Sequence, residues 1–121
     1  MNVDEIVDQV TEEIYRLEPA LLERFGEQGK AKCREDNHHH MRHLRTAYEL
    51  DETKVFSDYA VWLDGILTRH GMKTEHLVDN FGMIKSLLAE DNSEPAKSYC
   101  QYLMRAIEIL KGKSETEEVG N

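Results

Sequence analysis

Apolar residues recur every three or four positions along most of the chain, and this spacing constrains the fold more than any other feature of the sequence. Alternation of apolar and polar residues, which marks a half-buried strand, does not occur between turn residues. The sequence therefore predicts an all-α fold, an antiparallel helical bundle of four long helices plus one short helix. The residues expected on its apolar stripes include Val7, Val10, Ile14, Met41, Leu44, Ala47, Phe56, Tyr59, Trp62, Leu63, Leu77, Phe81, Ile84, Ala96, Leu103 and Leu110.

Proline and glycine mark the expected helix ends. Pro19 cannot continue a helix but fits its first turn, so a short helix is expected to begin there and to end at Gly26. A longer and more polar helix follows over about residues 29–50, and Asp51 is expected to cap the next one. Gly71 is the expected stop of that helix. Later caps are expected at Thr74, Asn92 and Ser93, with Pro95 in the first turn of the last helix.

The length of the chain predicts a single domain. It has 121 residues and a mass of 14.1 kDa, enough to bury roughly two-thirds of the unfolded surface without disulfides or metal. We expect this helical domain to span residues 1–111. Residues 112–121 contain one aliphatic residue and no periodicity, which predicts a disordered acidic tail.

The charge balance excludes several classes of partner. Fifteen Lys and Arg residues stand against 24 Asp and Glu, which gives a formal net charge of −9. Such a chain repels phosphate backbones and anionic lipid surfaces, so we expect neither a nucleic-acid nor a membrane partner.

The N-terminus and the cysteines predict a cytoplasmic protein. Residues 1–5 lack the basic and apolar regions of a signal peptide, and no apolar run is long enough to cross a bilayer. Cys33 and Cys100 lie far apart and outside any Cys-x-x-Cys pattern, so we expect two reduced, half-buried thiols.

Four histidines within six positions make one expected helix chemically distinctive. Glu35, His39 and His43 follow one another at intervals of four, so they form a row of potential ligands for a transition metal. A second row, Asp36, His40 and His43, lies closer to the apolar stripe. There the carboxylate of Asp36 could orient the ring of His40.

Two other interpretations of the histidine segment stay open. Glu35-x-x-His38 has the half-site spacing of carboxylate-bridged di-iron bundles, but a second Glu-x-x-His is missing from the chain. The simplest interpretation is a solvated polar face with one buried histidine, His40, held by a hydrogen bond.

Outside that segment, Trp62 and His76 are the candidate cofactor contacts. Trp62 is the only tryptophan and falls on an apolar stripe, which favours a core anchor over a wall of a planar-ligand pocket. His76 or His70 could ligate haem, although no Cys-x-x-Cys-His attachment motif is present. Phosphate-binding and nucleophile-elbow motifs are also missing, so an enzyme is not expected.

One stretch of the chain suggests a family. The run from Phe25 to Asp36, Phe-Gly-Glu-Gln-Gly-Lys-Ala-Lys-Cys-Arg-Glu-Asp, is followed by His40. Together with Asp58-Tyr59, Trp62-Leu63, Arg69 and Gly71, it resembles the helical module before vitamin B12-binding domains in bacterial cobalamin-dependent regulators and sensors.

The resemblance covers about residues 15–90 and implies a segment that senses, dimerises or covers a cofactor. The sequence has no Rossmann-like half to bind cobalamin, so we expect a stand-alone sensor or interaction module.

Three functional hypotheses follow. The first is a cytosolic sensor or regulatory domain that binds a protein partner and forms a homodimer, with Tyr102, Met104 and Leu110 supplying apolar surface. The alternative is a helical bundle that binds a single metal, haem or a corrinoid through the histidine-rich helix. A small enzyme is the third, and it requires Asp36, His40 and Trp62 in one pocket.

Overall fold

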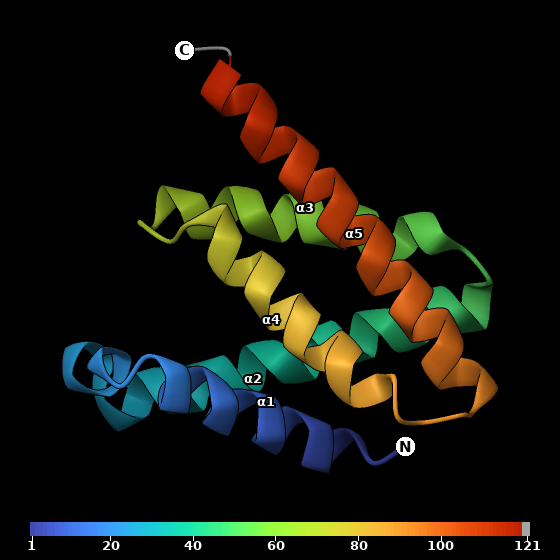
Figure 1. Ribbon diagram of the computed structural model, residues 1–121, viewed down its shortest axis with the longest axis horizontal. Coiled ribbons are helices and arrows are strands. Elements are labelled where there is room, and N and C mark those ends of the chain that lie inside the picture. The colour runs from blue at the N-terminus through green and yellow to red at the C-terminus, as the bar shows by residue number, and fades with distance from the viewer. Residues whose placement is uncertain (120–121) are drawn as a thin grey trace. The chain divides into compact units, whose positions relative to one another are not determined.

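The computed structural model describes residues 1–119, with side chains described through Lys113. Five α-helices account for nearly all of this part of the chain, and no strand occurs in it, which confirms the all-α prediction (Figure 1). None of these helices is long and apolar enough to cross a membrane. The helices are α1 (Val3–Leu17), α2 (Ala20–Leu50), α3 (Thr53–Arg69), α4 (Thr74–Leu88) and α5 (Glu94–Val119).

The chain divides into two compact units, Met1–Arg42 and a second that begins at His43. The N-terminal unit consists of α1 and the part of α2 up to Arg42. Asn2 caps α1, since its Oδ1 accepts the backbone N–H of Glu5 at 3.1 Å. The buried side chains of α1 are Val7, Val10 and Thr11, a spacing of three and one that places them on one helical face.

A sharp kink near the start of α2 gives the N-terminal unit its turn. Gly26 has a φ of 68° and ψ of −168°, a left-handed conformation that interrupts the helix where a stop was predicted. A side chain at Gly29 would collide with the Cβ of Phe25, so the second glycine permits the close approach of the two segments. The kink separates the short helix expected after Pro19 from the longer one.

The C-terminal unit contains the rest of α2 together with α3, α4 and α5. The α4 and α5 helices run antiparallel, and α3 packs against α5 (Figure 1). The rings of Phe56 and Phe81 lie 5.2 Å apart in its interior. All but one of the fully buried apolar side chains of this unit lie on the predicted stripes, and the exception is Ala60. Those on the stripes are Leu44, Ala47, Phe56, Phe81, Ile84, Leu88, Ala96, Leu103, Ala106 and Leu110.

The helix ends differ from prediction at two caps. Thr74 is the first residue of α4, and Lys73 occupies its N-cap position, one residue earlier than expected. Asp51 adopts a φ of 51° at the end of α2, and Glu52 caps α3 by accepting the backbone N–H of Lys54 at 3.3 Å. The cap therefore lies one residue later than expected, because Asp51 is used for the left-handed turn that Asp tolerates. Gly71, with a φ of 89°, and Ser93, whose Oγ accepts the N–H of Ala96, occupy their predicted places.

Three predictions of burial are wrong. Trp62 is not a core anchor, since 63% of its surface is exposed. Tyr102 and Leu110 do not add to the surface, because both are buried in the C-terminal unit, whereas Met104 is exposed.

The domain boundaries proposed from sequence stay a prediction. The α5 helix is described through Val119, eight residues after position 111 by sequence number. The last two residues of the expected tail, 120–121, and the side chains beyond Lys113 lie outside the described part.

Candidate functional site

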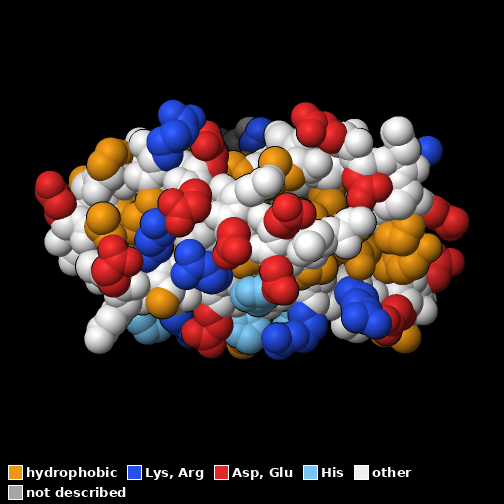
Figure 2. Space-filling model, turned by 90° about the horizontal axis from the view of Figure 1, so that it is seen from below, with side chains coloured by type: hydrophobic (Ala, Val, Ile, Leu, Met, Phe, Trp, Pro, Cys, Tyr) orange, Lys and Arg blue, Asp and Glu red, His pale blue; other side chains and the backbone are white. Residues whose placement is uncertain are grey.

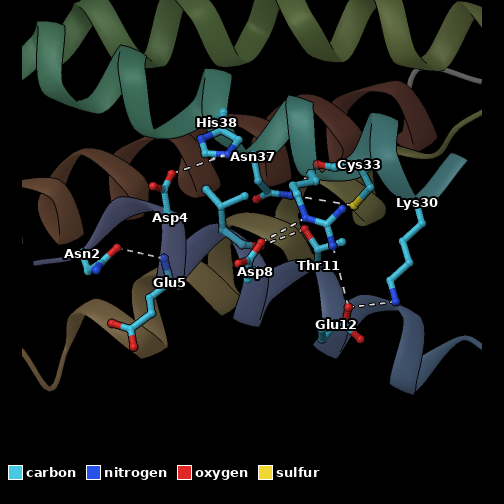
Figure 3. A network of polar contacts seen from close by, with 12 residues as sticks. Asn2, Asp4, Glu5, Asp8, Thr11, Glu12, Lys30, Cys33, Asn37 and His38 are labelled. Carbon is cyan, nitrogen blue, oxygen red and sulfur yellow. Dashed lines mark hydrogen bonds and ion pairs between the residues drawn. The ribbon is translucent and has the colours of Figure 1, made fainter. Parts of the chain in front are cut away.

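The two faces of interest are the histidine-rich part of α2 and the outward face of α3. Figure 2 shows several histidine side chains on the face in view, among acidic and basic side chains. In the N-terminal unit, His38 Nε2 lies 3.9 Å from Asp4 Oδ1 (Figure 3). Next to this pair is a series of ion pairs between α1 and α2: Arg34 Nε with Asp8 Oδ1 at 3.0 Å and Lys30 Nζ with Glu12 Oε1 at 2.8 Å. This surface is thus occupied by contacts that join the two helices.

Below these ion pairs lies a small buried polar cluster. Thr11 Oγ1 donates to the carbonyl of Val7 at 2.8 Å, and Asn37 Nδ2 donates to the carbonyl of Cys33 at 3.0 Å. Burial, and secondarily the charge of Asp36, raises the pKa of the Cys33 thiol. A thiol with a raised pKa is a poor nucleophile and metal ligand at neutral pH. The cluster therefore suits a structural role.

Both ring nitrogens of His39 have neighbours on its own helix. Its Nε2 lies 3.7 Å from Glu35 Oε1, and Arg42 Nη1 donates to its Nδ1 at 3.3 Å. A guanidinium that donates to the imidazole places a positive charge beside any cation bound there. This contact disfavours a metal ion at His39.

In the second row of the histidine segment, Asp36 pairs with Lys32, one helical turn before it, with Lys32 Nζ 3.5 Å from Asp36 Oδ1. Burial raises the pKa of the Asp36 carboxyl. His40 is 2% exposed and is the buried histidine that the sequence predicted.

The other candidate ligands have structural contacts as well. His76 Nδ1 accepts the backbone N–H of Lys73 at 3.1 Å, which is one half of a capping box at the start of α4. His70 Nδ1 lies 2.8 Å from the carbonyl of Ile66, at the end of α3.

Among the described residues, no group of three or more His, Cys, Asp or Glu side chains is arranged to hold a metal ion. Glu35, His39 and His43 therefore gain no support as a ligand set, and the metal site stays a prediction.

His43 belongs to an aromatic stack in the C-terminal unit. The centroid of its ring lies 3.7 Å from that of the Tyr59 ring, and the two planes are 11° apart. The ring centroids of Tyr59 and Trp62 are 6.4 Å apart. Tyr59 is buried while Trp62 projects into solvent. The Tyr59 ring therefore lies beside the exposed indole at a tilt of 36°, and it is itself stacked on His43.

The outward face of α3 continues on both sides of Trp62. Val61 is exposed beside it, and Gly65 lies one turn further along. A Cβ at Gly65 would meet nothing within 4 Å, so the surface is open at that point. Charged side chains flank these residues: Asp58, which pairs with Lys54 at 3.3 Å, and Arg69 near the end of the helix.

The opposite face of α3 carries a buried charge that sequence reasoning missed. Asp64 is buried, and its Oδ2 accepts from Lys113 Nζ of α5 at 3.1 Å. Its Oδ1 has no partner among the described residues. A charged residue in an otherwise apolar stripe at positions 63–67 was the available signal for this pair.

Comparison with protein-family models, with curated proteins and with solved structures finds no match to this chain. The resemblance to the helical module of cobalamin-dependent regulators therefore stays a prediction.

Proposed function

We propose that this protein is a helical regulatory or sensory domain that acts by binding a protein partner through the outward face of α3. The exposed indole of Trp62 is the observation that carries the proposal. Tryptophan is strongly enriched among residues that dominate binding energy, and a rigid, pre-oriented ring costs little to immobilise. In the proposed role the stack of Tyr59 and His43 holds that ring in place.

The neighbours of Trp62 suit the same role. Val61 adds apolar area beside the indole, while Lys54, Asp58 and Arg69 form a charged rim. An apolar centre with a charged rim is the usual composition of a protein interface. The proposal includes three predictions made from the sequence: a cytoplasmic location, a sensor role and an antiparallel bundle arrangement.

The alternative, a metal, haem or corrinoid site on the histidine-rich helix, has no comparable support. His38, His39 and His76 each contact a carboxylate or a backbone group of the chain. A colourless, metal-free protein purified from supplemented medium would end that alternative, whereas stoichiometric metal that is lost in His39→Ala would revive it.

Site-specific crosslinking in the source cells tests the proposed function. A photo-reactive benzoylphenylalanine at position 61 should give one discrete product, and the same group at the exposed Glu108 of α5 should give none. The crosslinked protein, once identified by mass spectrometry and purified, must bind the wild-type chain and fail to bind Trp62→Ala. Absence of a product from position 61 would refute the proposal.

A further inference from the structure

The exposed residues of α3 follow the spacing of a helix-pairing seam. Asp58, Trp62, Gly65 and Arg69 are separated by four, three and four positions, which places them in a row along one face. The row spans 11 residues, about 17 Å at the rise of an α-helix. The side chain of Asp58 is 66% exposed, and Trp62 and Arg69 are exposed as well. A second helix could therefore lie along this row.

Gly65 has no explanation within the chain itself. It lies inside α3, and among the described glycines a positive φ occurs only at Gly26 and Gly71. Glycine inside a helix is unfavourable relative to alanine. A Cβ at position 65 would have no atom of a neighbouring segment within 4 Å, so no close packing requires glycine there. A glycine next to an exposed tryptophan on the seam instead leaves a hollow that an outside group can enter.

The seam is complementary to itself under a two-fold rotation. Consider two antiparallel α3 helices related by a two-fold axis that passes between positions 63 and 64. Each residue of one copy then faces the residue of the other copy whose number adds to its own to give 127. Trp62 then faces Gly65 of the second copy, and Asp58 faces Arg69 of the second copy. Each large ring thus meets the hollow, and each carboxylate meets a guanidinium.

We propose that the outward face of α3 binds a second copy of this chain in an antiparallel α3–α3 pair. The inference rests on the proposed function and names its partner. Charge complementarity decides the orientation, because a parallel pair would place Asp58 against Asp58 and Arg69 against Arg69. The net charge of −9 on each copy opposes association at long range, but at ~0.15 M salt the Debye length is about 8 Å and close pairs dominate.

A charge-reversal cycle tests this pairing in the full-length chain. Asp58→Arg and Arg69→Asp each place like charges at both ends of the seam, while the double variant restores two opposite pairs. Sedimentation velocity at ~0.15 M salt should show a wild-type dimer that dissociates on dilution. Each single variant should weaken the dimer about tenfold, and the double variant should recover most of that loss. Glu108→Arg, which reverses another exposed charge, this time on α5, is the matched control and should leave the dimer intact.

The rescue separates pairing from folding. Arg69 Nε also donates to the carbonyl of Gly65 in its own helix at 3.0 Å, so Arg69→Asp alone could loosen the end of α3. A loosened helix would not be repaired by Asp58→Arg, so recovery in the double variant supports the pair. A wild-type monomer at all concentrations, or a double variant as weak as the singles, would overturn it. If position 61 nevertheless crosslinks a different protein, the proposed function stands and only the self-pairing fails.

Discussion

The histidine-rich part of α2 and the outward face of α3 differ in how their conspicuous side chains are used. In the former, His38 faces Asp4, His39 contacts Glu35 and Arg42, and Asp36 pairs with Lys32. On α3, the largest aromatic side chain of the chain projects into solvent beside a glycine with empty space around it. Side chains that could ligate a metal are thus held in contacts within the chain in one region, whereas an exposed aromatic side chain stands beside a glycine in the other.

Removal of the Trp62 indole should produce the largest of the predicted effects, a loss of self-association. Trp62→Ala is expected to weaken self-association by about 30-fold or more, the loss typical of a central aromatic anchor. The monomer should keep its thermal stability, because 63% of the side chain is exposed. Sedimentation velocity and thermal unfolding followed by circular dichroism measure the two quantities.

A Trp62→Ala protein that unfolds at much lower temperature would show that the ring is needed for the fold, contrary to this expectation. Met104→Ala, which truncates another exposed apolar residue, this time on α5, is the control and should leave association unchanged.

The inward face of α3 should control stability instead. Lys113→Met removes the partner of the buried Asp64 carboxylate, and an uncompensated buried charge costs about 2 kcal/mol or more. Chemical denaturation should show this loss. Combining Lys113→Met with Asp64→Leu should restore much of the stability, because both charged groups are then gone. Unchanged stability in Lys113→Met would contradict the importance of this pair.

A substitution at Gly65 should affect stability and association in opposite directions. Gly65→Ala is expected to raise the unfolding free energy of the monomer by about 1 kcal/mol, since it improves helix propensity and meets no neighbour. It should also weaken the dimer, because the added methyl group fills the hollow that faces Trp62. Denaturation at a concentration below the dissociation constant, together with sedimentation at higher concentration, separates the two effects.

Gly82 provides the matched control for that experiment. It lies inside α4, and a Cβ there would also meet nothing within 4 Å. Gly82→Ala should therefore gain similar stability with no change in association. If both alanine variants associate as the wild type does, the hollow at Gly65 has no role in pairing.

The smallest expected effect concerns the pH dependence of the histidine-rich segment. Burial raises the pKa of Asp36 in the folded protein, so the folded state binds a proton more readily than the unfolded state. The contribution of Asp36 to the free energy of unfolding therefore increases as the pH falls through the pKa of the folded state, and it decreases as the pH rises. Asp36→Asn should be slightly more stable than wild type at neutral pH, and the difference should shrink in acid.

Thermal unfolding over a series of pH values measures this effect. The matched control is Glu35→Gln, a neighbouring carboxylate on the same helix. If the stability advantage of Asp36→Asn over the wild type instead grew on acidification, the sign would be the reverse of the one expected here.

The sequence predicted the helices well because each follows from local rules. The apolar stripes, the stop at Gly26, the cap at Ser93 and the turn at Gly71 depend on residues within a few positions of one another. Asp51 shows the limit of such rules, since the same side chain suits both a cap and a left-handed turn, and only the geometry of the connection chose the turn.

The candidate site was harder to predict because exposure depends on the width of each buried stripe. Trp62 and Leu110 both lie on apolar stripes, yet the first is exposed and the second fully buried. The α5 helix that carries Leu110 packs against α3 and α4, and periodicity within α5 does not reveal such tertiary contacts. Likewise, four clustered histidines indicate metal chemistry only if their neighbours leave them to a ligand, and Arg42 and Asp4 lie against two of them.

The fluorescence of Trp62 gives the most direct measurement of whether two copies pair along α3, because it is the only tryptophan in the chain. Emission and acrylamide quenching would be recorded over a dilution series that spans the monomer–dimer transition. Pairing predicts blue-shifted, protected emission at high concentration that changes to the spectrum of a solvent-exposed indole as the dimer dissociates. Emission that stays red-shifted and fully quenchable at every concentration would contradict it.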